Sequence, residues 1–165
     1  MGKYLTCLSY TLRHKWYVFL ECRKLGITWQ GITHDMSKFR LREFIPYAKF
    51  FYSKPRDKTG YYKPTDTGNA DFDFAWLLHQ KINKHHWQWW ILPEDCGKLK
   101  VLSMPEKYRK EMIADWIGAG KAQGFISPVD DKFKEVRKWY ISNRDKMNLH
   151  PETRTWIEDF IEVTL

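Results

Sequence analysis

The sequence predicts a single all-α domain. At 165 residues, the chain has the usual size of one domain and is long enough to bury a substantial core. Hydrophobic residues make up 43% of the chain and aromatic residues 17%, a composition that excludes a disordered protein. No segment alternates between apolar and polar residues for long enough to predict a strand. Helices separated by short, well-marked breaks therefore account for the pattern.

The first half of the chain predicts three helices. The first covers about residues 3–24 and ends at Gly26, a residue suited to a left-handed cap. A second helix at about 35–52 precedes a loop at 53–70 that is rich in Pro, Gly, Asp and Thr. A third helix is expected at about 71–90.

The second half predicts three more helices. The sequence SMPE, residues 103–106, has the pattern of a capping box with Pro in the first turn, and predicts a helix that runs to about Gly118. SPVD at 127–130 and HPE at 150–152 open two further helices. GAGKAQG at 118–124 lacks the complete phosphate-loop pattern and follows a helix, so no phosphate loop is predicted. No repeat or linker divides the chain, which predicts one domain over residues 1–165.

Cysteine content and the N-terminal segment indicate a cytoplasmic protein. Cys7, Cys22 and Cys96 are odd in number and lack a C-x-x-C spacing, so neither a disulfide framework nor a cysteine zinc site is expected. The apolar N-terminal segment is interrupted by the charged stretch RHK at 13–15. This interruption predicts a buried helix and no membrane association.

The formal net charge is +8, from 28 Lys and Arg against 20 Asp and Glu. This balance favours acidic partners such as nucleotides, RNA or DNA, because a long-range positive field attracts anions. A basic surface also keeps a small protein soluble, so charge alone does not choose between these roles. Nucleic acid stays open as a partner, and the sequence leaves the oligomeric state open.

Residues 34–38 read HDMSK, which places two metal-capable side chains, His34 and Asp35, next to each other. Adjacent residues on a helix point about 100° apart, so these two need a turn to reach one ion. The start of the second predicted helix provides that turn. His14 on the first helix and Asp115 in the apolar segment EMIADWIG complete an ordered set of His, His-Asp and Asp. A carboxylate in such an apolar setting is usually paired, hydrogen-bonded or coordinated.

This ordered set resembles the HD-domain superfamily of metal-dependent phosphohydrolases. The resemblance implies an HD-like helical bundle with one divalent metal bound by His14, His34, Asp35 and Asp115. It covers about residues 10–120 as the motif-bearing core and leaves the C-terminal helices, at about 128–162, outside it.

HDMSK is also similar to the HD-x-G-K variant of this superfamily, with Ser37 in place of the glycine and Lys38 at the lysine. A closer likeness to a group of bacterial and phage proteins, which share the HD-like pattern and an HHW segment, implies no activity.

Two-metal members of the superfamily carry extra histidines between the HD pair and the last Asp, and His79, His85 and His86 fill that interval here. The resemblance therefore implies one or two divalent ions per chain. On a continuous helix, His79 and His86 would lie about 10 Å apart along the axis, too far to bind the same ion. Either one of them binds metal while the other meets substrate, or the helix breaks between them.

The chemistry of such a site explains the residue types. A divalent ion lowers the pKa of its bound water toward about 7 and neutralises phosphoryl charge. Asp35 and Lys38 are the predicted catalytic residues: Asp35 as a bridging ligand that orients water, and Lys38 as a contact for a phosphate oxygen. Mixed nitrogen and oxygen ligation suits Mn²⁺, Fe²⁺, Co²⁺ or Zn²⁺. The expected substrate is a small phosphorylated molecule, a nucleotide or a related phosphoester. Trp87 and Trp90 are predicted to contact it, since aromatic faces stack on nucleobases, although such clusters more often form core.

Each candidate also has a structural explanation. His14 could be a hydrogen-bonded histidine in an aromatic core. Asp115 could be a solvated helix residue near Glu111. The His34–Asp35 pair could simply cap a helix. These explanations leave the ordered set unaccounted for. The leading hypothesis is thus a metal-dependent phosphohydrolase. The alternatives are a non-catalytic, basic helical module that binds nucleic acid, and a diiron HD-type oxygenase.

Overall fold

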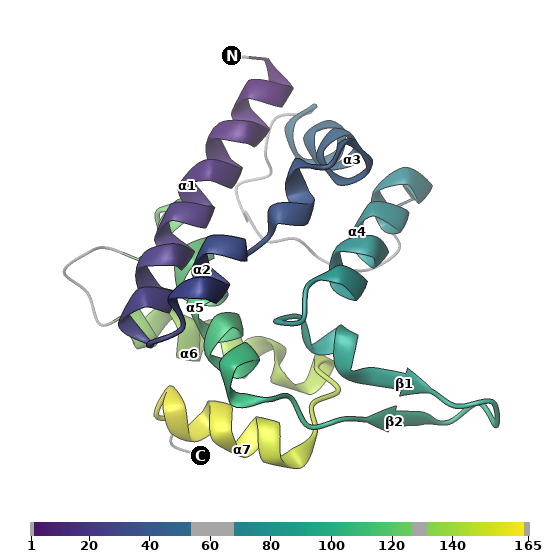
Figure 1. Cartoon of the computed structure of the whole chain (residues 1–165), viewed down its shortest axis with the longest axis vertical. Helices are drawn as coiled ribbons and strands as arrows, with labels where there is room; N and C mark the ends of the chain where they lie inside the picture. The colour runs from purple at the N-terminus through teal and green to yellow at the C-terminus, as the bar shows by residue number, and fades with distance from the viewer. Residues whose placement is uncertain (1, 54–67, 127–131, 164–165) are drawn as a thin grey trace.

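The computed structural model describes residues 2–53, 68–126 and 132–163, and over these residues the fold is all-α, as predicted (Figure 1). Its helices, with short 3-10 turns marked η, are α1 Lys3–Lys24, α2 Thr28–Thr33, η1 Met36–Phe39, α3 Leu41–Tyr52, α4 Ala70–Ile82, η2 Trp87–Trp90, α5 Glu106–Gln123, α6 Lys132–Asn143, η3 Arg144–Lys146 and α7 Pro151–Phe160. None of the helices described is both long and apolar enough to cross a membrane.

Two helices differ from the prediction. The second was expected at about 35–52, whereas the chain forms α2 first, then turns at residues 34–35 and enters α3 only at Leu41. The third was expected to reach residue 90, whereas α4 ends at Ile82 because Asn83 adopts an extended conformation with φ −99° and ψ 109°. Both departures occur beside candidate site residues. The predicted loop at 53–70 lies mostly outside the described residues.

A small antiparallel hairpin departs from the prediction of no strands. β1 Ile91–Pro93 pairs with β2 Leu99–Val101, and Gly97 has a positive φ of 80° in the connecting turn. The hairpin extends away from the helices (Figure 1). Strands of three residues are too short to produce a detectable alternation of apolar and polar side chains, which explains why the sequence pattern missed them.

The ends of α5 and α7 show which predicted caps form. The prediction of a capping box at Ser103 is wrong. The hydroxyl of Ser103 donates to Glu152 Oε2 at 2.8 Å, and no side chain caps the start of α5. α5 instead runs past residue 118 to a left-handed cap at Gly124, so most of GAGKAQG is helical. The side chain of His150 accepts from the backbone of Glu152 and caps α7. The predicted helix start at 127–130 lies outside the described residues.

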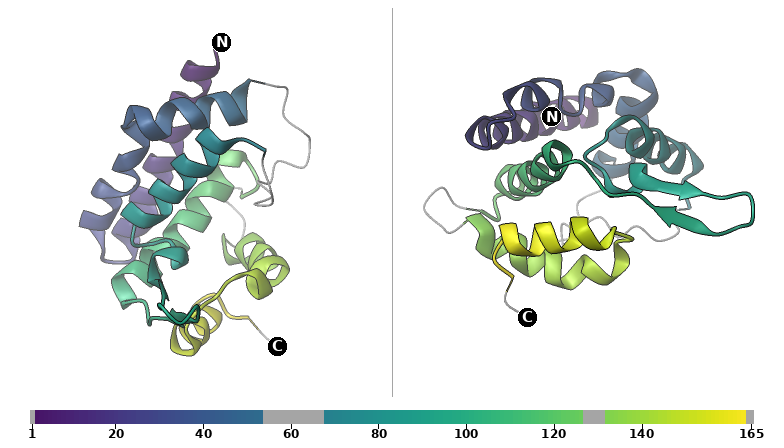
Figure 2. Two further views of the ribbon diagram at one scale, coloured as in Figure 1. Left: turned by 90° about the vertical axis from the view of Figure 1, so that its right-hand side faces the viewer. Right: turned by 60° about the horizontal axis from the view of Figure 1, so that its bottom comes forward.

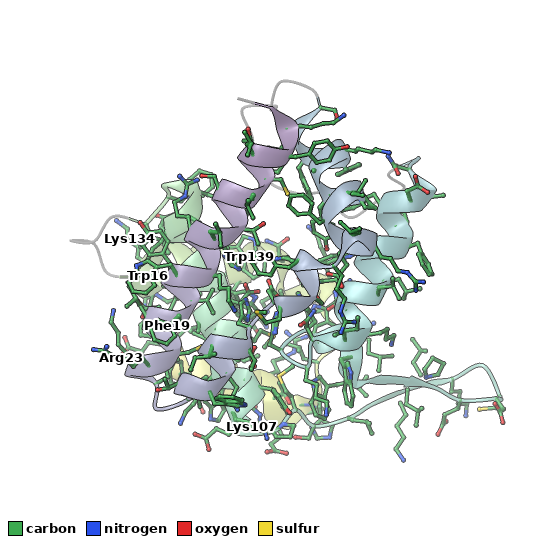
Figure 3. The ribbon with its side chains drawn as sticks, turned by 45° about the horizontal axis from the view of Figure 1, so that its top comes forward. Trp16, Phe19, Arg23, Lys107, Lys134 and Trp139 are labelled. Carbon is green, nitrogen blue, oxygen red and sulfur yellow. The ribbon has the colours of Figure 1, made fainter. Side chains whose placement is uncertain are left out.

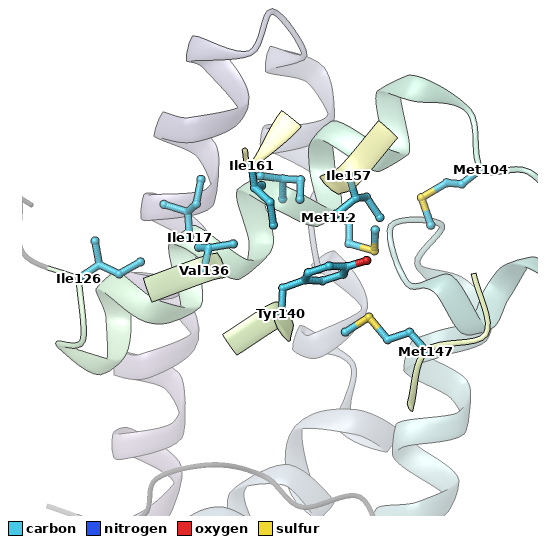
Figure 4. Close-up of a cluster of buried hydrophobic side chains, with 10 residues drawn as sticks. Met104, Met112, Ile117, Ile126, Val136, Tyr140, Met147, Ile157 and Ile161 are labelled. Atoms are coloured by element: carbon cyan, nitrogen blue, oxygen red, sulfur yellow. The ribbon is translucent and has the colours of Figure 1, made fainter. Parts of the chain in front are cut away.

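The helices pack in two groups around α5. α1 packs against α2, α3 and α5, while α5 also contacts α6 and α7 (Figure 2). Tyr140 is fully buried at the centre of the C-terminal core (Figure 4), which is formed by Met104, Met112, Ile113, Ile117, Ile126, Val136, Tyr140, Met147, Ile157 and Ile161.

α1 and α5 cross at close range. A Cβ atom on Gly118 would lie 2.5 Å from Cγ2 of Val18, so only glycine allows this approach. Trp16 and Arg23 lie on the outer side of α1 (Figure 3), whereas His14 is buried. The buried face of α1 therefore carries a histidine toward the helix that carries Asp115.

Candidate metal centre

The structure brings all seven predicted metal ligands into one cluster. His14 comes from α1 and Asp115 from α5, while the others come from α4 or from the turns around α2 and α4. Three groups of possible ligand atoms form among the described residues: two groups of four share Asp35, and His34, His85 and Glu111 make a third. We name the first subsite as His14, His34, Asp35 and Asp115, and the second subsite as Asp35, His79, His85 and His86.

His34 and Asp35 both face the first subsite because the backbone turns sharply between α2 and η1. Asp35 has φ 53° and ψ 24°, in the left-handed region that Asp tolerates better than most residues. Lys15 ties this turn to α1, because its Nζ donates to the carbonyl oxygens of Ile32 and His34, both at 2.7 Å. Backbone strain of this kind is often stored at functional sites. The turn expected at residues 34–35 is therefore present, although α3 begins six residues after Asp35.

The first subsite joins α1, α5 and the turn after α2. Nε2 of His14 lies 3.0 Å from Oδ1 of Asp115 and 3.7 Å from Oδ2 of Asp35. Nε2 of His34 lies 3.4 Å from Oδ1 of Asp115 and 3.3 Å from Oδ2 of Asp35. Two imidazole nitrogens and two carboxylate oxygens thus face a common point.

The second subsite forms because the chain breaks after α4. The extended Asn83 turns His85 and His86 back toward His79, and the ring centroids of His79 and His86 lie 4.7 Å apart. Nε2 of His79 and Nε2 of His85 lie 3.4 and 3.5 Å from Oδ1 of Asp35. The two carboxylate oxygens of Asp35 therefore face different subsites. Of the two arrangements open from the sequence, the structure has the broken helix.

Most of the inward-facing atoms have no hydrogen-bond partner within the described part of the chain. They are Nε2 of His14, His34, His79, His85 and His86, and Oδ1 of Asp35, and all are buried. An unsatisfied buried polar atom costs about 1–3 kcal/mol, so several around one point need an explanation. Coordination of a cation in each subsite would satisfy them.

The outward-facing nitrogens are held by two buried glutamates that the sequence did not single out as site residues. Oε1 of Glu111, on α5, lies 3.1 Å from Nδ1 of His34 and 3.1 Å from Nδ1 of His85. Oε2 of Glu43, on α3, lies 2.9 Å from Nδ1 of His79. When Nδ1 donates to a carboxylate, the lone pair of Nε2 is free to bind metal. Glu111 precedes Asp115 by one helical turn, which is the only sequence signal for it.

Hydrogen bonds around Glu43 also fix the break after α4. Ser37 donates to Glu43 Oε2 at 2.9 Å, and the side-chain amide of Asn83 donates to Ser37 Oγ at 2.9 Å. Ser37 occupies the glycine position of the HD-x-G-K pattern. It therefore links the turn at residues 34–35 to the break at Asn83.

Charges in the cluster keep its carboxylates ionised. Burial raises the pKa of Asp35, but the charges of His34, Lys38 and His79 outweigh burial and hold the pKa well below its usual range. Burial likewise raises the pKa of Asp115, but the nearby imidazoles of His14 and His34 outweigh burial and hold the pKa well below its usual range. Burial, together with the neighbouring His85 and His79, lowers the pKa of His86 well below its usual value. The pKa of His34 moves the other way: burial lowers it, but the carboxylates of Asp35, Asp115 and Glu111 outweigh burial and raise it well above its usual value. Ionised carboxylates and neutral imidazoles are the forms that bind metal, so a metal ion must displace the proton of His34.

The other predicted site residues take different positions. Nζ of Lys38 lies 2.6 Å from Oδ2 of Asp35, at the edge of the first subsite. Trp87 and Trp90 pack against the C-terminal core, and Nε1 of Trp90 donates to the carbonyl oxygen of Lys84. The aromatic ring nearest the second subsite is instead Trp76, which stacks on His79 with centroids 5.6 Å apart. Substrate contact by Trp87 and Trp90 stays a prediction.

The fold and the cluster define an all-α protein whose buried histidines and carboxylates can hold metal ions. The chain belongs to a family of unknown function, DUF5662, whose family model matches residues 3–163. No curated protein and no solved structure matches the chain.

Proposed function

We propose that this protein is a metal-dependent phosphohydrolase that acts on a nucleotide or a related phosphoester. The observation that carries the proposal is the position of Asp35 between two groups of buried imidazole nitrogens that have no hydrogen-bond partner among the described residues. One carboxylate that faces two subsites is the arrangement needed for a ligand shared by two ions. The resemblance of the ordered His, His-Asp and Asp set to HD-domain phosphohydrolases supports the same chemistry.

The donor set fits divalent transition metals. Metal–nitrogen and metal–oxygen bonds of about 2.0–2.2 Å place neighbouring ligand atoms about 3–3.5 Å apart in tetrahedral or octahedral geometry. In the first subsite, three of the four ion-pair distances between imidazole and carboxylate atoms run from 3.0 to 3.4 Å, and the fourth is 3.7 Å. Imidazole and carboxylate together suit Mn²⁺, Fe²⁺, Co²⁺ or Zn²⁺, with one or two ions per chain.

The bound ions would supply activated water and neutralise phosphoryl charge. Asp35, whose two carboxylate oxygens face different subsites, would orient the attacking water. Lys38 and Asp115 keep 20% and 17% of their side chains exposed, whereas the side chains of His14, His34, His79 and His85 are at most 4% exposed. Substrate therefore approaches from the side of Lys38, whose ammonium group attracts a phosphate oxygen. The overall charge of +8 favours the same anionic substrates.

Metal content and phosphatase activity of the untagged protein test the proposal. We expect up to two ions of Mn²⁺, Co²⁺ or Zn²⁺ per chain and metal-dependent release of phosphate from a panel of nucleotides and phosphate esters. Asp35→Ala should abolish both metal binding and turnover while the helical circular dichroism spectrum persists. Iron with oxygen consumption would favour an oxygenase. A metal-free protein with salt-sensitive nucleic-acid binding would favour a binding module.

A further inference from the structure

We infer that Glu111 is a positioning residue for both metal subsites, through hydrogen bonds to one histidine of each. This inference rests on the proposed metal centre and assigns a role to a residue outside the two subsites that share Asp35. A single oxygen, Oε1, lies 3.1 Å from Nδ1 of His34 in the first subsite and 3.1 Å from Nδ1 of His85 in the second.

Glu111 and the two histidines that it contacts are almost completely shielded from solvent. The side chain of Glu111 is only 8% exposed, and those of His34 and His85 are 0% and 2% exposed. A buried carboxylate held by two imidazole N–H groups orients both rings.

The rings of His34 and His85 pack against each other, so their orientations are coupled. Their centroids lie 4.4 Å apart with an interplanar angle of 38°, so a rotation of either ring disturbs the other. In the neutral form that binds metal, a ring whose Nδ1 donates to Oε1 carries its lone pair on Nε2, and both Nε2 atoms lie buried, facing the subsites. Glu111 thus fixes the tautomer and the direction of one ligand in each subsite at the same time.

The position of Glu111 on α5 adds a second link. Asp115, one helical turn further on the same helix, is a direct ligand of the first subsite. One rigid helix therefore supplies a ligand to one subsite and the orienting carboxylate to both. Partners of this kind typically change metal affinity by about 10- to 100-fold when they are removed.

The test uses single-subsite backgrounds. His86→Ala removes a ligand of the second subsite only, and His14→Ala removes a ligand of the first only. Metal-free protein is titrated with Co²⁺, and binding is followed by calorimetry and by the visible absorption of the bound ion. We expect Glu111→Ala to weaken Co²⁺ binding by about 10-fold or more in both backgrounds. Glu111→Gln, whose amide oxygen still accepts both hydrogen bonds, should recover most of this loss.

Glu106→Ala is the matched control, because Glu106 lies on the same helix with its side chain 60% exposed and pairs with Lys110. It should leave both affinities unchanged. Circular dichroism in the presence of EDTA checks that each variant folds without metal. The inference is overturned if Glu111→Ala weakens one background only or neither, or if Glu111→Gln is no better than Glu111→Ala.

The same titration separates this inference from the proposed function. Wild-type protein that binds two Co²⁺ ions but hydrolyses no phosphate ester would refute the hydrolase, and the variants would still decide the role of Glu111. Wild-type protein that binds no Co²⁺ would refute both.

Discussion

Nε2 of His14 and Oδ1 of Asp115 lie 3.0 Å apart, although one side chain comes from α1 and the other from α5. Their distance depends on how closely these two helices pack. Val18, one turn beyond His14, meets Gly118 at the same crossing. The geometry of the first subsite is therefore coupled to the packing of α1 on α5.

Gly118→Ala tests this coupling. The added Cβ would lie 2.5 Å from Cγ2 of Val18 and 3.0 Å from its backbone nitrogen, so the helices must separate. We expect the free energy of unfolding to fall by about 1–3 kcal/mol, as for other overpacked cores. Metal affinity at the first subsite should fall as well, measured by calorimetry in the His86→Ala background. The control is Gly2→Ala, where nothing lies within 4 Å, and full metal affinity in Gly118→Ala would contradict the coupling.

Metal removal should destabilise the protein. Without an ion, the inward-facing nitrogens of the cluster stay buried with no hydrogen-bond partner in the part of the chain that the structure describes. A ligand present at 100 times its dissociation constant stabilises the folded state by about 2.7 kcal/mol. We expect EDTA to lower the melting temperature in calorimetry, and added Co²⁺ or Mn²⁺ to restore it. Asp35→Ala should show no such response, and an equal metal response in that variant would place the bound ions elsewhere.

The sequence predicted which side chains gather in the cluster better than it predicted the backbone that holds them. His14 and Asp115 occur in apolar segments long enough to predict helices, and the structure has both helices. The break at Asn83 could not be predicted, because the segment LLHQKINKHHWQWW contains neither Gly nor Pro. Asn83 ends α4 with help from a contact to Ser37, which is distant in the sequence. Tertiary hydrogen bonds decided the local structure there.

The two buried glutamates were missed for a related reason. A glutamate on a helix is most often a solvated surface residue, and the sequence indicated Glu111 only as a neighbour of Asp115. The structure instead directs Glu111 at two histidines that reach α5 from other parts of the chain. Glu43 reaches His79 in the same way, across α3 and α4. Such partners become visible only when the helices are placed together.

Lys38→Met should separate metal binding from turnover. Nζ of Lys38 lies 2.6 Å from Oδ2 of Asp35, so its removal takes a positive charge away from a metal ligand. Metal affinity should therefore stay the same or rise. The rate of hydrolysis should fall by about 100-fold, as expected for the loss of one group that stabilises developing charge. Lys110→Met on α5 serves as the control. If Lys38→Met keeps the wild-type rate of hydrolysis, Lys38 is not a catalytic residue.

The ion pairs of Glu21 predict a specific pH dependence of stability. This buried carboxylate on α1 contacts Nζ of Lys121 on α5 at 2.6 Å and Nζ of Lys24 at 2.8 Å. Burial raises the pKa of Glu21, but hydrogen bonds and charges from Lys121 and Lys24 outweigh burial and bring the pKa below its usual value. Because the folded pKa is depressed, the stabilisation is complete above the unfolded pKa of about 4.3 and is lost as the pH falls through the folded pKa.

Glu21→Gln should accordingly lower the free energy of unfolding at neutral pH by about 1.5–3 kcal/mol, the range for hydrogen bonds to charged groups. The difference from wild type should be constant from about pH 6 to pH 8 and shrink below about pH 4, where the wild-type carboxylate becomes protonated. Urea unfolding of wild type and Glu21→Gln between about pH 3 and pH 8 measures this difference in the free energy of unfolding. Asp95→Asn, at an exposed position in the β1–β2 turn, provides the reference for a carboxylate without such burial. A difference between Glu21→Gln and wild type that grows as the pH falls would reverse the sign and contradict the assignment.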